Sequence, residues 1–191
     1  MAKNYRGTLF LIIGNSGSGK DSIISGIIKK YPQNLKEIIV PRRFITRPPS
    51  EFERNISITP EEFKEMEKKG SFALKWHIYE LDYGIPVEIE NWLEKGHPVI
   101  INVSRTAVNE AKEKYSDVRV IFVEVPFEIT YQRIKDRKRE SEDILHKRIE
   151  RARKNQQFPE ADFFVDNSGI LDDAINQLLA YIISIVNGIE K

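Results

Sequence analysis

Cysteine is absent from the sequence, which excludes disulfide bonds, thiolate metal sites and a cysteine nucleophile. The chain has three histidines, His77, His97 and His146, and their spacing is not that of metal ligands. No combination of serine, histidine and aspartate that resembles a nucleophilic triad is visible either. The sequence therefore lacks the residue patterns of several common catalytic sites.

A large net charge and long apolar runs are also missing. The formal charge of the 191-residue chain is +1, which argues against nucleic acid or a membrane surface as the main partner. The apolar run at 9–13 is too short for the core of a signal peptide, and no run approaches the length of a membrane span. We therefore expect a cytoplasmic protein whose partners are small molecules. The oligomeric state does not follow from the sequence.

Strand-like and helix-like segments alternate along most of the chain. Continuous apolar runs, typical of strands buried on both faces of a parallel sheet, occur at 8–14, 98–103, 118–125 and 163–165. Helices are expected at 23–31, 126–137, 141–157 and 171–186. This alternation predicts an α/β fold with a mostly parallel sheet flanked by helices.

Residues 37–95 interrupt that alternation and predict an inserted lobe. Within them, Thr59, Pro60 and Glu62 form the sequence pattern of a capping box, and Gly70 is the expected end of that helix. We interpret residues 1–191 as one domain. Its core would comprise 1–36, 97–132 and 159–191, with the lobe at about 37–95 and a helical lid at about 133–158.

The stretch GNSGSGKDS follows the first predicted strand and opens the first predicted helix. It has the spacing of a phosphate-binding loop, in which backbone N–H groups and a lysine bind the phosphates of a nucleotide. The predicted ligands are Gly14, Asn15, Ser16, Gly17, Ser18, Gly19 and Lys20. The alternative is a glycine-rich turn with no ligand.

Asp21 departs from this motif, because a serine or threonine usually follows the lysine and binds Mg²⁺. A carboxylate is also a hard oxygen ligand, so Asp21 is a candidate for the metal, as is Ser22 one place later. The structural alternative for Asp21 is an acid that stabilises the first turn of a helix.

A basic segment spans residues 133–154, with ten lysines or arginines against five acids. Arg133, Arg137 and Arg139 lie around the expected end of one helix and Arg148 lies in the next. An arginine-rich segment of this kind could close over a triphosphate and stabilise its charge. The alternative is a solvated helical hairpin with charge pairs along its surface.

A second basic set lies in the inserted lobe and contains Arg42, Arg43, Arg47 and Arg54. Two separate arginine sets in a nearly neutral chain suggest two phosphate-bearing substrates, unless the second set is only surface charge on a loop. The lack of a triad fits phosphoryl transfer to an acceptor that is already an anion, because such a reaction needs no strong base.

Over nearly its whole length the sequence resembles the guanylate-kinase-like P-loop kinases. The matching motifs are GNSGSGKDS, ITRPP, DYGIP, QRIKDRKRESEDILHKRI and VDNSG. Within them it is most similar to the ribose 1,5-bisphosphate phosphokinases, on RFITR, the Trp76-His77 pair and the segment 102–105. The GKDS form of the loop is a trait of that family, so Asp21 is no defect.

The resemblance implies a kinase that uses MgATP to phosphorylate ribose 1,5-bisphosphate to 5-phosphoribosyl 1-diphosphate. Lys20, Arg133, Arg137 and Arg148 would be catalytic, and Asn167 would lie near the adenine. The residues implied for the acceptor are Arg43, Arg47, Tyr83, Asn102 and Arg105.

The nearest alternative is a guanylate kinase or another nucleoside monophosphate kinase. Guanylate kinases resemble this chain but have carboxylates that pair with guanine, where we match Leu74 and Asn102. A leucine offers no acceptor to the N–H groups of the base. A non-catalytic binding module of the same fold is a second alternative, which the intact loop with Lys20 argues against.

Overall fold

The computed structural model describes residues 1–49, 55–136 and 142–188, and its contacts divide the chain into two compact units. Unit 1 comprises Met1–Leu9 and Lys36–Val118, and unit 2 comprises Phe10–Leu35 and Arg119–Lys191. Each unit buries its own set of apolar side chains. None of the helices within the described ranges combines the length and the hydropathy that a transmembrane segment needs.

Unit 2 contains nearly all of β1 (Leu9–Gly14) and β7 (Val118–Glu124), together with β8 (Phe163–Asp166). The three strands are neighbours in the order β1-β7-β8. The β7 and β8 strands run parallel, with Ile121 opposite Phe163 and Val123 opposite Val165. The side chains of β1 from Leu9 to Ile13 are fully buried, as the unbroken apolar run predicts.

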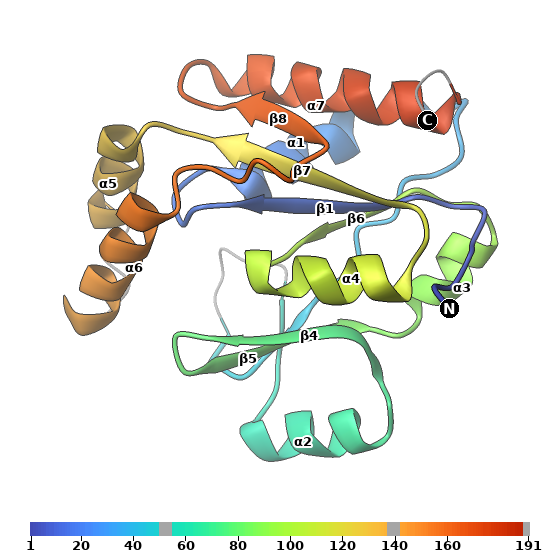
Figure 1. Cartoon of the computed structure of the whole chain (residues 1–191), viewed down its shortest axis with the longest axis horizontal. Helices are drawn as coiled ribbons and strands as arrows, with labels where there is room; N and C mark the ends of the chain where they lie inside the picture. The colour runs from blue at the N-terminus through green and yellow to red at the C-terminus, as the bar shows by residue number, and fades with distance from the viewer. Residues whose placement is uncertain (50–54, 137–141, 189–191) are drawn as a thin grey trace. The chain divides into compact units, whose positions relative to one another are not determined.

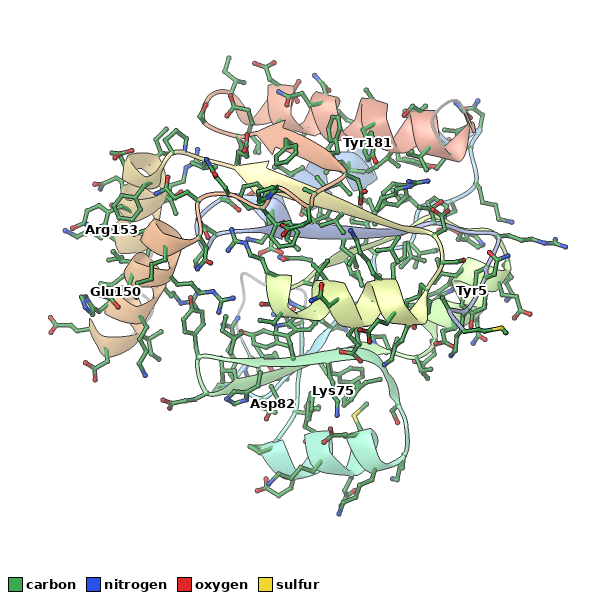
Figure 2. The ribbon with its side chains drawn as sticks, viewed as in Figure 1. Tyr5, Lys75, Asp82, Glu150, Arg153 and Tyr181 are labelled. Carbon is green, nitrogen blue, oxygen red and sulfur yellow. The ribbon has the colours of Figure 1, made fainter. Side chains whose placement is uncertain are left out.

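The helices of unit 2 are α1 (Lys20–Lys30), α5 (Phe127–Asp136), α6 (Glu142–Lys154) and α7 (Leu171–Val186). The α6 helix ends at Lys154, three residues earlier than the sequence pattern predicts. The α1 and α7 helices pack closely, because a Cβ atom at Gly26 would lie 2.2 Å from Cδ1 of Ile175. Tyr181 of α7 stacks on Phe163 of β8, with ring centroids 4.2 Å apart (Figure 2).

Unit 1 has a four-stranded sheet in the order β3-β2-β5-β4. Its strands β4 and β5 are labelled in Figure 1. Its strands are β2 (Phe44–Ile45), β3 (Ile56–Ser57), β4 (Phe72–Ile78) and β5 (Leu81–Pro86). The β4–β5 hairpin turns at Tyr79 and Glu80, which both have positive φ, as the tight turns of hairpins require. The unit also contains β6 (Val99–Asn102), α3 (Ile89–Glu94), the 3₁₀ helix η1 (Arg105–Ala107) and α4 (Val108–Lys114).

The helix α2 (Pro60–Lys68) begins with the predicted capping box. The N–H of Glu62 donates to the hydroxyl of Thr59 at 3.1 Å, and the N–H of Thr59 donates to the carboxylate of Glu62 at 2.7 Å. At the other end, Gly70 has a φ of 69°, so it ends the helix in the left-handed conformation that glycine favours. The predicted start and the predicted end of this helix are both confirmed.

A charged group holds the N-terminal segment on the rest of unit 1. The carboxylate of Glu90 accepts hydrogen bonds from Lys3 at 2.6 Å, Tyr115 at 2.9 Å and Tyr5 at 3.0 Å. Tyr5 is labelled in Figure 2. Burial acts to raise the pKa of Glu90, but these hydrogen bonds outweigh it and hold the pKa below its ordinary value. Burial and the same carboxylate raise the pKa of Tyr5 to about 12.

We predict that Glu90→Gln lowers the free energy of unfolding at pH 7 by about 1–3 kcal/mol, because charged hydrogen bonds to a half-buried group are lost. A carboxyl group with a lowered folded-state pKa stabilises the fold above its ordinary pKa. That contribution disappears as the pH falls through the folded-state value. The difference between the two proteins should therefore shrink below about pH 4.

Urea unfolding at several pH values measures this difference. Glu88→Gln is the matched control, since Glu88 is an exposed glutamate two residues away. If Glu90→Gln lowered the free energy of unfolding by the same amount at pH 7 and at pH 3, the electrostatic explanation would be contradicted.

Candidate active site

The predicted phosphate loop connects β1 to α1 in unit 2. Gly14, Gly17 and Gly19 all have positive φ. At Gly19 two constraints coincide, because φ is 87° and an added Cβ atom would lie only 2.3 Å from Nδ2 of Asn167. Only glycine satisfies both the conformation and the close contact. The loop is therefore a tight turn with another side chain packed directly against it.

Lys20 is the first residue of α1, and its ammonium group lies on the loop. The Nζ atom donates to the carbonyl oxygens of Gly14 at 2.9 Å and Asn15 at 2.8 Å, and to the hydroxyl of Ser18 at 3.2 Å. No side chain caps the start of this helix, where Gly19 is the N-cap residue. A positive charge beside the N-terminus of a helix is an arrangement that binds anions.

Two of the three predicted lid arginines lie on this loop. The guanidinium of Arg133 donates to the carbonyl oxygens of Asn167 at 3.1 Å and Gly17 at 3.5 Å. The guanidinium of Arg148 donates to the hydroxyl of Ser16 at 2.7 Å. Arg137, the third, lies outside the described residues. Lys20, Arg133 and Arg148 thus bring three cationic groups to one short loop.

Two asparagines connect the loop to other parts of unit 2. The side-chain amide of Asn15 donates to the carbonyl oxygen of Ala152 in α6 at 3.2 Å. The side-chain amide of Asn167, which follows β8 and is 3% exposed, donates to the carbonyl oxygen of Ser18 at 2.7 Å. The contact with Ala152 uses a backbone carbonyl group, which no sequence pattern marks in advance.

Asp21 and Ser22 lie in the first turn of α1, and both side chains are exposed. Among the described residues, no three His, Cys, Asp or Glu side chains are grouped as a metal cage. This suits Mg²⁺, which keeps several waters and takes one or two protein oxygens together with substrate phosphates. The oxygen donors of Asp21 and Ser22 therefore fit a magnesium ion that arrives with a nucleotide.

In unit 1 the contacts of Arg43 bring three of the predicted acceptor residues together. Its Nε donates to the side-chain oxygen of Asn55 at 2.9 Å, and its NH1 donates to the carbonyl oxygen of Asn102 at 3.0 Å. The same guanidinium lies 5.6 Å from the ring centroid of Tyr83. Tyr83 is in turn stacked on Trp76, with ring centroids 5.2 Å apart. Arg105 lies further along the chain, as the first residue of η1.

Arg47 lines a pocket of about 210 Å³ in unit 1. The other lining residues are Arg42, Ile45, Pro48, Pro49, Asn55 and Ser57. Arg42 also donates to the carbonyl oxygen of Asn55 at 3.0 Å. With two guanidinium groups and no acid among these lining residues, the pocket suits an anion. No motif in the sequence marks Asn55 and Ser57 as lining residues, although both follow closely after the arginine-rich segment.

Leu74 is buried in unit 1. It is 0% exposed in β4, where it pairs with Ile85 of β5, so its side chain belongs to the core of unit 1. The neighbouring Lys75 points away from this core toward α2 and forms an ion pair with Glu67 (Figure 2). A leucine offers no acceptor to a ligand, and the expectation that it replaces a base-binding carboxylate of guanylate kinases stays a prediction.

Comparisons with known proteins show the family to which the chain belongs. The sequence matches the guanylate kinase family over residues 6–184. It is 35% identical to the ribose 1,5-bisphosphate phosphokinase PhnN of Pseudomonas paraeruginosa over 178 residues, which cover 92% of this chain and 95% of the relative. The corresponding protein of Pectobacterium atrosepticum is 37% identical over 171 residues, covering 88% of this chain and 89% of the relative.

A solved guanylate kinase from Anaplasma phagocytophilum has the same fold, with a TM-score of 0.67 and 17% sequence identity, covering 98% of this chain and 88% of that structure. The family match and this fold neighbour confirm the α/β P-loop fold predicted from the sequence. They also confirm the predicted resemblance. The chain belongs to the guanylate kinase family, and within that family it is related to the ribose 1,5-bisphosphate phosphokinases.

Proposed function

We propose that the chain is a cytoplasmic ATP-dependent kinase that phosphorylates ribose 1,5-bisphosphate on its 1-phosphate and releases 5-phosphoribosyl 1-diphosphate. The observation that carries the proposal is the convergence of Lys20, Arg133 and Arg148 on the loop 14–20. The acceptor is taken from the relatives, whose names state ribose 1,5-bisphosphate as the substrate.

In this proposal the loop amides and Lys20 bind the β- and γ-phosphates of ATP. The ammonium group of Lys20 donates hydrogen bonds to two carbonyl oxygens of the loop. Phosphate oxygens would replace or join these acceptors. Arg133 and Arg148 supply guanidinium groups that stabilise the charge on the transferring phosphoryl group. Residues 133–158 would act as the lid and 37–95 as the acceptor lobe.

Asp21 and Ser22 would hold Mg²⁺ at the start of α1 through their oxygen donors. When bound, the ion neutralises charge on the β- and γ-phosphates. The protein residues supply the rest of the positioning.

For the acceptor, Arg42 and Arg47 supply the cationic groups of the pocket in unit 1. An oxygen of the acceptor's 1-phosphate attacks the γ-phosphorus of ATP, and the bond from that phosphorus to the bridging oxygen breaks, so that ADP leaves. The attacking oxygen is already anionic, so no general base is required. The reaction needs positioning of both substrates and stabilisation of charge, and the arginines and Lys20 would stabilise the charge.

We predict that Lys20→Ala lowers kcat by on the order of 10²–10³-fold, by analogy with the removal of one transition-state hydrogen-bond donor. Steady-state kinetics with MgATP and ribose 1,5-bisphosphate measures this change. Lys29→Ala is the control, because Lys29 lies in the last turn of the same helix. A folded Lys20→Ala protein with near-normal turnover would contradict the role of this lysine.

We predict that Arg148→Ala lowers kcat by about 10²-fold and changes the KM for ATP less, because the guanidinium acts mainly on charge that develops during transfer. Arg148→Lys should recover only part of the activity, since lysine lacks the planar fork of donors. The control is Arg153→Ala on the same helix, where the guanidinium lies 5.0 Å from the ring centroid of Phe127. If Arg148→Ala and Arg153→Ala lowered kcat by the same factor, a specific role of Arg148 in catalysis would be contradicted.

The acceptor assignment is tested by comparing ribose 1,5-bisphosphate with GMP. The relatives are named for ribose 1,5-bisphosphate, and the pocket in unit 1 offers two guanidinium groups to a phosphate. We predict a kcat/KM for the sugar bisphosphate at least ~10²-fold above that for GMP. Arg47→Ala should raise the KM for the acceptor and leave the KM for ATP nearly unchanged.

Arg6→Ala is the control for the acceptor measurement, because Arg6 is an exposed arginine of unit 1 that does not line the pocket. Equal turnover of GMP and the sugar bisphosphate would show that the acceptor is misassigned, while the ATP site would stand. If MgATP does not stabilise the protein against heat, the chain is a binding module and the kinase proposal fails.

A further inference from the structure

Asn167 has a set of contacts that a residue reading the adenine base would not need. Its side chain is 3% exposed, and its amide nitrogen is committed to the carbonyl oxygen of Ser18 at 2.7 Å. Its backbone N–H donates to the carbonyl oxygen of Glu124 at the end of β7, at 3.0 Å. Its backbone carbonyl accepts from Arg133 at 3.1 Å. Backbone and side chain together therefore connect the sheet, the α5 helix and the phosphate loop.

The contact with Ser18 determines the orientation of one peptide group. Because a peptide bond is planar and trans, the C=O of Ser18 and the N–H of Gly19 point in opposite directions. A donor that holds the carbonyl group from one side therefore directs the N–H of Gly19 to the other side. In a phosphate loop the backbone N–H groups of this turn bind the phosphates.

At Gly19 the amide of Asn167 packs directly against the backbone of the loop. A Cβ atom at this position would lie 2.3 Å from the same amide nitrogen of Asn167, well inside the normal contact distance. The turn also needs the positive φ of 87° at Gly19. The absence of a side chain at Gly19 thus lets the amide of Asn167 reach the peptide group behind it.

We infer that Asn167 is a positioning residue, which holds the Ser18–Gly19 peptide so that the N–H of Gly19 is directed toward the phosphates of the nucleotide. This role rests on the proposed function of the loop as an ATP site. It differs from the sequence-based expectation that Asn167 lies near the adenine.

A ligand that lacks the adenine distinguishes a residue that positions the Ser18–Gly19 peptide from one that contacts the adenine. Asn167→Leu removes the donor, keeps a similar size and adds no charge. We expect this variant to weaken the binding of MgATP and of inorganic tripolyphosphate by the same factor, about ten-fold, the size of one lost buried hydrogen bond. Isothermal titration calorimetry with each ligand measures the two dissociation constants, at a temperature where circular dichroism shows the protein fully folded.

Ser168→Ala is the matched control, because it changes the next residue of the same loop and leaves the amide of Asn167 in place. Asn167→Ala is the second variant, which removes the donor without filling its space. Amide hydrogen exchange of the ligand-free protein should be faster at Gly19 in both Asn167 variants and unchanged in Ser168→Ala.

Weaker binding of MgATP with unchanged binding of tripolyphosphate would overturn the inference, because Asn167 would then contact the base. Unchanged binding of both ligands would also overturn it. If both Asn167 variants lose the fold, the residue is structural and the positioning role fails. The proposed function fails separately, if the unchanged protein binds neither ligand.

Discussion

Hydrogen bonds to the carbonyl groups of the phosphate loop are the interactions on which the candidate ATP site depends. The loop has little side-chain volume of its own, and its backbone carbonyl groups are held by its own Lys20 and by donors from elsewhere in unit 2. Lys20 reaches the carbonyl groups of Gly14 and Asn15, Arg133 reaches that of Gly17, and Asn167 reaches that of Ser18. Each of these bonds restrains the direction of the N–H group in the same peptide plane.

Two arginines of the proposed lid, Arg133 and Arg148, are also held at the loop by hydrogen bonds. The Arg133 guanidinium donates to loop and neighbouring backbone, and Arg148 donates to Ser16. Cationic groups that are already oriented lose less freedom when a triphosphate binds, so more of the interaction energy remains for catalysis. In the proposed reaction, phosphate oxygens would replace or join the protein partners of both arginines.

Unit 1 uses arginines in two different ways. Arg43 is tied to Asn55, Asn102 and the ring of Tyr83, so it supports the structure around the end of β6. Arg42 also donates to the carbonyl oxygen of Asn55, but together with Arg47 it lines the pocket that suits an anion. Arg42, Arg43 and Arg47 lie in the same short segment of the sequence. Only their side-chain contacts therefore distinguish the two roles. An arginine count alone cannot distinguish a supporting arginine from one that binds substrate.

Local patterns in the sequence determined much of this protein. The capping box at Thr59, the stop at Gly70, the buried run of β1 and the loop ending in Lys20 each depend on residues a few positions apart, where backbone conformation and hydrogen bonding are decided locally. Only the tertiary structure decided that Leu74 is buried, that Arg43 supports Asn102, and that Asn167 holds Ser18. Asn167 and Ser18 are 149 positions apart, and such a contact depends on how the strands and helices pack rather than on any pattern along the chain.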